Sequence, residues 1–355
     1  MNYQLRLENL VKNLPKHRLD GVVITLPVNL FYFTGVRLDG CALVVTGKDA
    51  ALFASPMFYD QVVNYGLKLD VYLAKDGVGE EFNRFLTKKK LRSVGLELGK
   101  ISYAFWEKIS SLSKIKWGRA DNLIEELRQI KDAEEIECIR QACRIAQAAF
   151  RHCRQIIKPG VSEKEVGREL EYFMKKKGAE KSSFELIVAG GKNSAYPHHF
   201  TSDYVFQKDD SVLIDWGCFY KGYASDLTRV IFLGKITKLH SKLLKTVANA
   251  QKQAIAKIKP GMKASQIDWV ARQTVTKAGF EDRFIHNTGH GIGLEIHEGP
   301  YLSSKSKSIL KSGMVITVEP GIYLPGLGGI RIEDTVLVTK SGVEALTGNN
   351  GSLRA

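Results

Sequence analysis

Short apolar runs alternate with amphipathic segments over the first third of the chain. Residues 5–14 and 80–90 carry apolar side chains at helical spacing and predict two helices. Four apolar runs have the length and composition of strands, and these are 21–26, 41–46, 50–54 and 93–96. The turn signal Gly47-Lys48-Asp49 separates the second run from the third. Strands that alternate with helices predict an open α/β sheet in this region.

The pattern changes just before Asp132. This residue is a candidate helix N-cap, and Glu135, three residues later, completes a capping box. A long periodic helix follows and is expected to run to about Ile157. We therefore expect a domain boundary near residue 125, which gives one domain at 1–125 and a second at 126–355.

An internal repeat lies in the second region. Residues 157–180 align without gaps with residues 258–281, at an offset of 101. Each segment contains a helix end, a Pro-Gly turn, a second helix and a C-terminal glycine, Gly178 or Gly279. A repeat of about 100 residues is too long for a solenoid unit. It predicts two duplicated half-domains related by a pseudo-twofold axis, with a site at their interface.

A first apolar hairpin, expected within 212–231, carries two carboxylates. With its turn centred between Tyr220 and Lys221, Asp215 lies opposite Asp226. Directly opposed side chains share one face of a hairpin, with Cβ atoms about 5 Å apart. Two ionised carboxylates at that distance are unfavourable unless a cation or a proton lies between them.

A second apolar hairpin repeats this arrangement within 315–336. The turn-rich segment 325–329 is centred at Gly326, and a fold-back there places Glu319 opposite Glu333. Both hairpins therefore bring paired acids into apolar surroundings.

Three of the eight histidines fall within 12 residues between the hairpins: His286, His290 and His297. Four carboxylates with at least one imidazole match an oxygen-rich site for divalent metals. Carboxylates suit manganese, and an imidazole also admits cobalt, zinc or iron. Two such ions about 3.5–4 Å apart would neutralise four acids and activate a water molecule.

These motifs form a recognisable set. The Asp215-x10-Asp226 spacing, His290 in GHGIGLEIHE, Glu319 in VEPGIY and Glu333 in GIRIED resemble the pita-bread metallopeptidases, above all the Xaa-Pro peptidases aminopeptidase P and prolidase. The NLFYFTG segment at 29–35 resembles the N-terminal domain of these enzymes. The resemblance covers nearly the whole chain. It implies a creatinase-like N-terminal α/β domain followed by a duplicated pita-bread catalytic domain of α/β (α+β) type.

The resemblance also implies roles for individual residues. Asp215 would bind one metal ion, and His290 with Glu319 would bind the other. Asp226 and Glu333 would bridge the two ions, which are expected to be manganese, with cobalt, zinc or iron as alternatives.

Further residues match the catalytic positions of the family. His198 corresponds to a histidine that stabilises the transition state, and His297 to one that contacts the substrate carbonyl. Glu319 would also shuttle a proton. His286 and Arg331 match positions that support the metal ligands, whereas the neighbouring His199 matches no position with a known role.

The implied reaction removes an N-terminal residue that precedes proline. We expect aminopeptidase P activity rather than that of a prolidase, which cleaves only dipeptides. Similar short prolidases tend to carry an arginine just after the His-Glu-x-Pro run, where its fork binds a free carboxylate. Tyr301 occupies that place here, although Lys305 or Lys307 could do the same task.

Other members of the fold are less compatible with the chain. Methionine aminopeptidase shares the ligands but lacks the N-terminal domain, and creatinase lacks the metal set. A non-catalytic pita-bread binding module, such as a histone-chaperone domain, has no need for four buried acids.

Composition changes this picture little. Lys and Arg number 52 against 38 Asp and Glu, a net charge of +14, but the basic residues are scattered, and we expect no nucleic-acid partner. The chain lacks a signal peptide and an apolar run of about 20 residues, so we expect a cytoplasmic protein without a membrane partner. Its five cysteines are expected to be buried thiols. The family resemblance implies a homodimer that acts on proline-containing peptides.

Overall fold

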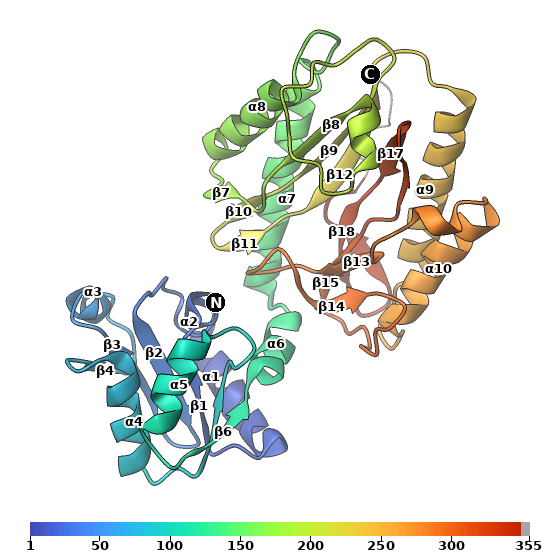
Figure 1. Ribbon diagram of the computed structural model, residues 1–355. Coiled ribbons are helices and arrows are strands. Elements are labelled where there is room, and N and C mark those ends of the chain that lie inside the picture. The colour runs from blue at the N-terminus through green and yellow to red at the C-terminus, as the bar shows by residue number, and fades with distance from the viewer. Residues whose placement is uncertain (349–355) are drawn as a thin grey trace. The chain divides into compact units, whose positions relative to one another are not determined.

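The computed structural model describes residues 1–348 and divides the chain into two compact units (Figure 1). The first unit is Met1–Arg128, and the second begins at Gln129. Residue 125, where the sequence places a domain boundary, lies inside helix α6 (Asp121–Gln129).

A six-stranded mixed sheet forms the centre of the first unit, in the order β4-β3-β2-β1-β5-β6. Its strands are β1 (Gly21–Ile24), β2 (Cys41–Thr46), β3 (Ala50–Ala54), β4 (Asp70–Leu73), β5 (Ser93–Leu96) and β6 (Lys116–Arg119). The helices before α6 are α1 (Tyr3–Asn13), α2 (Pro27–Thr34), α3 (Tyr59–Asn64), α4 (Val78–Lys88) and α5 (Tyr103–Ser111), with a 3₁₀ turn at Leu14–His17. The predicted α/β sheet is confirmed, and β2, β3 and β5 begin and end where the apolar runs do.

The sheet of the first unit is buried on both faces. Phe82 and Leu86 of α4 pack in one core cluster with Val44 of β2. Leu43, which precedes Val44 in β2, and Leu52, which precedes Phe53 of the same cluster in β3, are also fully buried. Since successive strand residues point to opposite faces, both faces are covered, and this explains why these strands are continuously apolar rather than alternating.

The second unit contains the same arrangement of two helices and three strands twice. The first copy is α7 (Ala133–Cys153), α8 (Glu163–Lys176), β8 (Ile187–Gly190), β9 (Ser211–Trp216) and β12 (Leu227–Phe232). The second copy is α9 (Lys238–Lys257), α10 (Ala264–Lys277), β13 (Gly289–Gly291), β15 (Val315–Val318) and β18 (Asp334–Val338). Both ends of α10 lie 101 residues after those of α8, which confirms the repeat.

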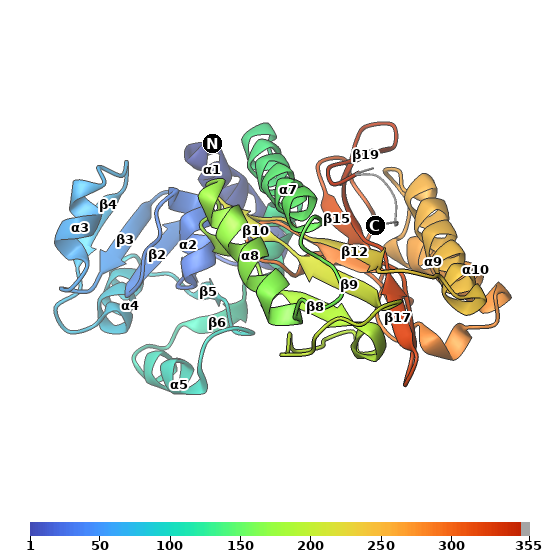
Figure 2. The ribbon, with the colours of Figure 1, turned by 90° about the horizontal axis from the view of Figure 1, so that it is seen from above.

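Shorter elements complete the second unit. They are β7 (Lys181–Ser182), β10 (Cys218–Tyr220), β11 (Tyr223–Ala224), β14 (Glu298–Leu302), β16 (Gly321–Leu324), β17 (Gly328–Arg331) and β19 (Val343–Ala345), with 3₁₀ turns at Gly191–Ala195 and Glu281–Arg283. The strand order is β12-β9-β8 in one sheet and β14-β13-β15-β18-β19 in the other, so both copies share one order. In Figure 2 the strands lie between the helix pair α7–α8 and the helix pair α9–α10.

The helix boundaries follow the local chemistry. Asp132 accepts from the Glu135 N–H, and Glu135 accepts from the Asp132 N–H, so the predicted capping box of α7 is confirmed. The helix ends at Cys153, earlier than the predicted Ile157, because the next residues form tighter turns, in which the Ile156 N–H bonds to the Cys153 carbonyl. Gly178 and Gly279 follow α8 and α10 with φ of 97° and 84°, as predicted for helix C-caps.

The register of the first hairpin differs from the prediction. Asp215 pairs with Thr228 and not with Asp226. The turn is centred one position later than expected, at Lys221 and Gly222, whose φ values of 48° and 82° are those of a two-residue hairpin turn. This moves the pairing by two residues, so Asp226 stays on the same face as Asp215, as its diagonal neighbour.

The register of the second hairpin is confirmed. Val318 pairs with Asp334 and Gly321 with Arg331, so both pairs are symmetric about Gly326. The same symmetry places Glu319 opposite Glu333.

All five cysteines are free and buried, as expected: Cys41, Cys138, Cys143, Cys153 and Cys218. Within the described residues, the helices are too short or too polar to cross a bilayer.

The capping box of α7 yields a stability test. We expect Asp132→Ala to lower the free energy of unfolding of the second unit by about 1 kcal/mol, because the Glu135 N–H loses its acceptor. Asp132→Asn keeps an equally good cap and serves as the matched control. Urea denaturation measures both variants, and equal losses would show that the charge of Asp132 matters rather than the cap.

Candidate metal centre

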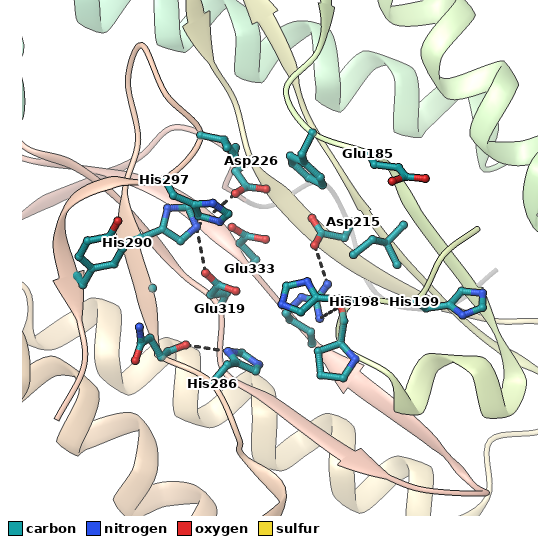
Figure 3. Close-up of a pocket in the computed structure, with 18 of the residues that line it drawn as sticks. Glu185, His198, His199, Asp215, Asp226, His286, His290, His297, Glu319 and Glu333 are labelled. Carbon is teal, nitrogen blue, oxygen red and sulfur yellow. Dashed lines mark hydrogen bonds and ion pairs between the residues drawn. The ribbon is translucent and has the colours of Figure 1, made fainter. Parts of the chain in front are cut away.

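The four predicted acids and His290 meet in one cluster, in which Asp226, Glu333 and His290 are buried and the other two acids are partly buried (Figure 3). Strand β9 carries Asp215 next to its last residue, and Asp226 directly precedes β12. Glu319 directly follows β15, and Glu333 lies between β17 and β18. Each copy of the repeat thus supplies one pair of acids, and β13 of the second copy adds the imidazole.

His290 points a ring nitrogen at two carboxylates. Its Nδ1 lies 3.0 Å from the Gly291 carbonyl oxygen, which can only accept, so Nδ1 carries a proton. Its Nε2 lies 3.3 Å from Glu319 Oε1 and 3.5 Å from Asp226 Oδ2. Burial opposes protonation of His290, but the contact with Glu319 outweighs it and raises the pKa, so without a cation a proton lies between the two side chains. In the neutral ring that binds a metal ion, this nitrogen is an acceptor that faces two further acceptors. A metal ion coordinated by all three atoms resolves that conflict.

Several carboxylate oxygens in the cluster are buried without a hydrogen-bond partner among the described residues. These atoms are Asp215 Oδ1, Asp226 Oδ1 and Glu333 Oε1. Potential ligand atoms of Asp226, His290 and Glu333 all lie within 4.8 Å of one another. Buried oxygens are normally hydrogen-bonded. Unpartnered carboxylate oxygens beside an imidazole therefore fit divalent cations.

The cluster perturbs the ionisation of its members. Burial raises the pKa of Asp226 well above its ordinary value, and the charges of Glu333 and Asp215 add to the rise. Burial also raises the pKa of Glu333 and, against the opposing charge of Arg331, that of Asp215. Burial alone would raise the pKa of Glu319 too, but its contact with His290 lowers it to about 2. These acids need positive charge to ionise together.

Arg331 supplies the main fixed positive charge beside the cluster. Its side chain is 3% exposed and lies 2.6 Å from Asp215 Oδ2. It also donates to Thr228 Oγ1 at 3.1 Å and to the Tyr323 hydroxyl at 2.7 Å. Thr228 in turn donates to Glu333 Oε2 at 2.7 Å. Arg331 thus holds one acid directly and another through a threonine.

Two threonines and a tyrosine were missed by the sequence reasoning. Thr317 accepts from the His290 backbone N–H at 3.0 Å and donates to Glu319 at 3.2 Å. Thr228 and Thr317 each lie two residues from an acid of the cluster, and strand periodicity places such residues on the same face. That periodicity could have identified both threonines, whereas nothing in the sequence points to the Tyr323 contacts.

The other histidines lie around the cluster at different depths. The His286 Nε2 lies 2.9 Å from the Tyr323 hydroxyl, and burial lowers the pKa of this histidine. The His297 ring stands edge-on to the His290 ring, with centroids 4.3 Å apart. Burial, followed by the charge of His290, lowers the pKa of His297. Both rings are therefore neutral near pH 7.

A cavity of about 440 Å³ opens onto the cluster. His198 and His297 line it together with the apolar side chains of Phe184, Phe200 and Ile296. An apolar pocket with a few convergent polar groups is the ordinary form of a small-ligand site.

Two family models match the chain, one for each unit. The metallopeptidase family M24 matches residues 137–340, and the creatinase/prolidase N-terminal domain matches residues 6–130. The chain belongs to metallopeptidase family M24. An Xaa-Pro dipeptidase of Pyrococcus furiosus is 42% identical over 344 residues, which are 96% of this M24 chain and 97% of the relative.

Solved structures of relatives share the whole fold. An Xaa-Pro dipeptidase from Bacillus anthracis is 34% identical, with a TM-score of 0.96 over 99% of both chains. An X-Pro aminopeptidase from Thermotoga maritima is 33% identical, with a TM-score of 0.89 over 98% of this chain and 99% of its own. The expected architecture, a creatinase-like N-terminal domain followed by a duplicated pita-bread catalytic domain, is therefore confirmed.

Removal of one cluster acid tests metal binding. We expect Asp226→Ala and Glu333→Ala to lower the bound metal and to abolish peptidase activity, because each removes a carboxylate oxygen that has no hydrogen-bond partner among the described residues. Elemental analysis of the purified variants measures the loss. Asp203→Asn, at an exposed acid paired with Lys164, is the control and should keep the full metal content. Full activity in a metal-depleted cluster variant would refute the assignment.

The raised pKa of Asp226 predicts a pH-dependent stability of the chelator-treated protein. An acid whose pKa is raised binds more protons in the folded than in the unfolded chain, so its contribution to the unfolding free energy falls as pH rises above its unfolded pKa of about 4. The lowered pKa values of His286 and His297 make the unfolding free energy rise with pH instead. The wild type is therefore compared with a variant that keeps both histidines, so that their contribution cancels.

We therefore expect the stability of the chelated wild type, relative to chelated Asp226→Asn, to decrease between about pH 5 and about pH 8. Urea denaturation across this range measures the difference. A difference that stays constant or grows with pH would contradict the ionisation assigned to Asp226.

Proposed function

We propose that this M24 metallopeptidase hydrolyses Xaa-Pro bonds and prefers Xaa-Pro dipeptides. The observation that carries the proposal is the buried cluster of four acids and His290 at the base of an apolar cavity. The dipeptidase names of relatives such as those of Pyrococcus furiosus and Bacillus anthracis support the choice of dipeptides. The sequence favours aminopeptidase P activity, and these relatives favour its alternative, prolidase.

Five residues would hold two divalent ions. Asp215 would bind one ion, His290 and Glu319 the other, and Asp226 with Glu333 would bridge them. When bound, the ions supply Lewis acidity and a water molecule of lowered pKa. Carboxylate-rich ligands support manganese, with cobalt, zinc and iron as the other candidates. The family resemblance further supports a homodimer.

Other residues would bind and orient the peptide. His198 and His297 line the cavity, and an imidazole N–H there would stabilise the oxyanion that develops on the carbonyl oxygen. Glu319 would carry the proton from the attacking water to the leaving nitrogen. The bond before proline is a tertiary amide without an N–H, so the site needs no acceptor for one. The walls formed by Phe184, Phe200 and Ile296 suit the proline ring.

One observation favours aminopeptidase P activity as a second candidate. Among the described residues, those that line the cavity include Tyr301 but neither Lys305 nor Lys307. Arg331 is the one lysine or arginine among the lining residues within 1–348, and it already pairs with Asp215. These lining residues thus offer no spare arginine fork for the free carboxylate of a dipeptide.

Substrate length separates the two candidates. We expect kcat/KM for an Xaa-Pro dipeptide to exceed that for the matching Xaa-Pro-Yaa tripeptide by at least about tenfold, a difference of about 1.4 kcal/mol. Peptides with alanine in place of proline are the controls and should react poorly. Equal or faster cleavage of the tripeptide would make aminopeptidase the better description.

A further inference from the structure

Two adjacent histidines on one loop have different surroundings. The loop runs from the end of β8 at Gly190 to Ser202. His198 lies beside Asp215 at the cluster, whereas His199 extends away from it (Figure 3). The His199 Nε2 lies 2.8 Å from an oxygen of Glu163, the first residue of α8.

Glu163 ties together distant parts of this loop. Its side chain is 0% exposed. Besides His199, its carboxylate accepts from the Gly190 N–H at 2.8 Å, the Asn193 side chain at 2.9 Å, and the Ser202 N–H and hydroxyl at 2.9 and 2.6 Å. One carboxylate therefore contacts the beginning, the middle and the end of the segment that carries His198.

The charge of Glu163 is well compensated where it lies. Burial alone would raise its pKa, but the hydrogen bonds from Asn193, Ser202, Gly190 and His199 together lower the pKa below its ordinary value. The N-terminus of α8 also favours a negative charge. Glu163 is thus ionised at neutral pH, and an ionised carboxylate is the stronger hydrogen-bond acceptor.

We propose that Glu163 and His199 are positioning residues that fix the His198 imidazole relative to the metal cluster. The inference rests on the role of His198 under the proposed function. Because His199 is the next residue along the chain, its bond to Glu163 fixes the backbone from which the His198 side chain projects. A displacement of a reacting group by about 1 Å can cost a factor of about 100 in rate.

A double-mutant cycle tests the inference. His199→Phe keeps a ring but loses the bond to Glu163, and His199→Gln restores a donor at a similar distance. We expect His199→Phe to lower kcat for an Xaa-Pro dipeptide at least tenfold, with KM changed less than twofold, and His199→Gln to recover most of the loss. Metal content should stay unchanged in both variants. Lys192→Ala, at an exposed site on the same loop, is the control and should leave kcat unchanged.

The same His199 variants are then made in a His198→Ala background. His198→Ala alone should keep its metals and lose about 10²–10³ in kcat. If His199 acts through His198, His199→Phe causes no further loss there. An equal further loss, or an unchanged kcat of His199→Phe in the wild-type background, would overturn the positioning role. A fully active His198→Ala would instead remove the role of His198 in the proposed function, and the inference with it.

Discussion

Four carboxylates lie together in a largely buried cluster, and the second unit has to balance their charge. The acids are Asp215, Asp226, Glu319 and Glu333, and the groups positioned to balance them are Arg331 and His290. Burying unbalanced charge is so costly that such groups give up their ionisation unless cations are present. The four carboxylates can therefore all be ionised only when cations are bound. Thr228 and Thr317 hold members of the cluster in place, and Tyr323 holds Arg331 beside it.

Three loops that bear site histidines are each attached to a charged side chain that is buried or partly buried. Glu163 holds the loop of His198 and His199. Arg272, paired with Asp268 of α10, donates to the carbonyls of Phe284 and His286. Lys131 lies 2.6 Å from Glu298, the neighbour of His297, and both side chains are almost fully buried. Loops are usually the mobile parts of a site, and these contacts attach the three loops to side chains elsewhere in the second unit.

Patterns with a strict period could be predicted from the sequence, and contacts between distant segments could not. Strands such as β2 and the duplicated helices α8 and α10 follow from apolar runs and from the ungapped repeat. The second hairpin was predicted in register because Gly326 marks its centre. The first was predicted two residues out of register because Lys221 adopts a conformation that is uncommon outside glycine, which composition does not reveal. The bonds of Glu163 join segments 27 to 39 residues apart and leave no periodic trace.

The division of the acids between two copies of one motif has a consequence for synthesis in the cell. The first copy ends with β12 and holds only Asp215 and Asp226, and the second pair is complete only at Glu333. A growing chain is made from its N-terminus, so the first copy can leave the ribosome well before its partner acids exist. During that interval the chain holds two neighbouring carboxylates without the imidazole or the other acids. A site that contains all four acids can therefore exist only after residue 333 has been translated.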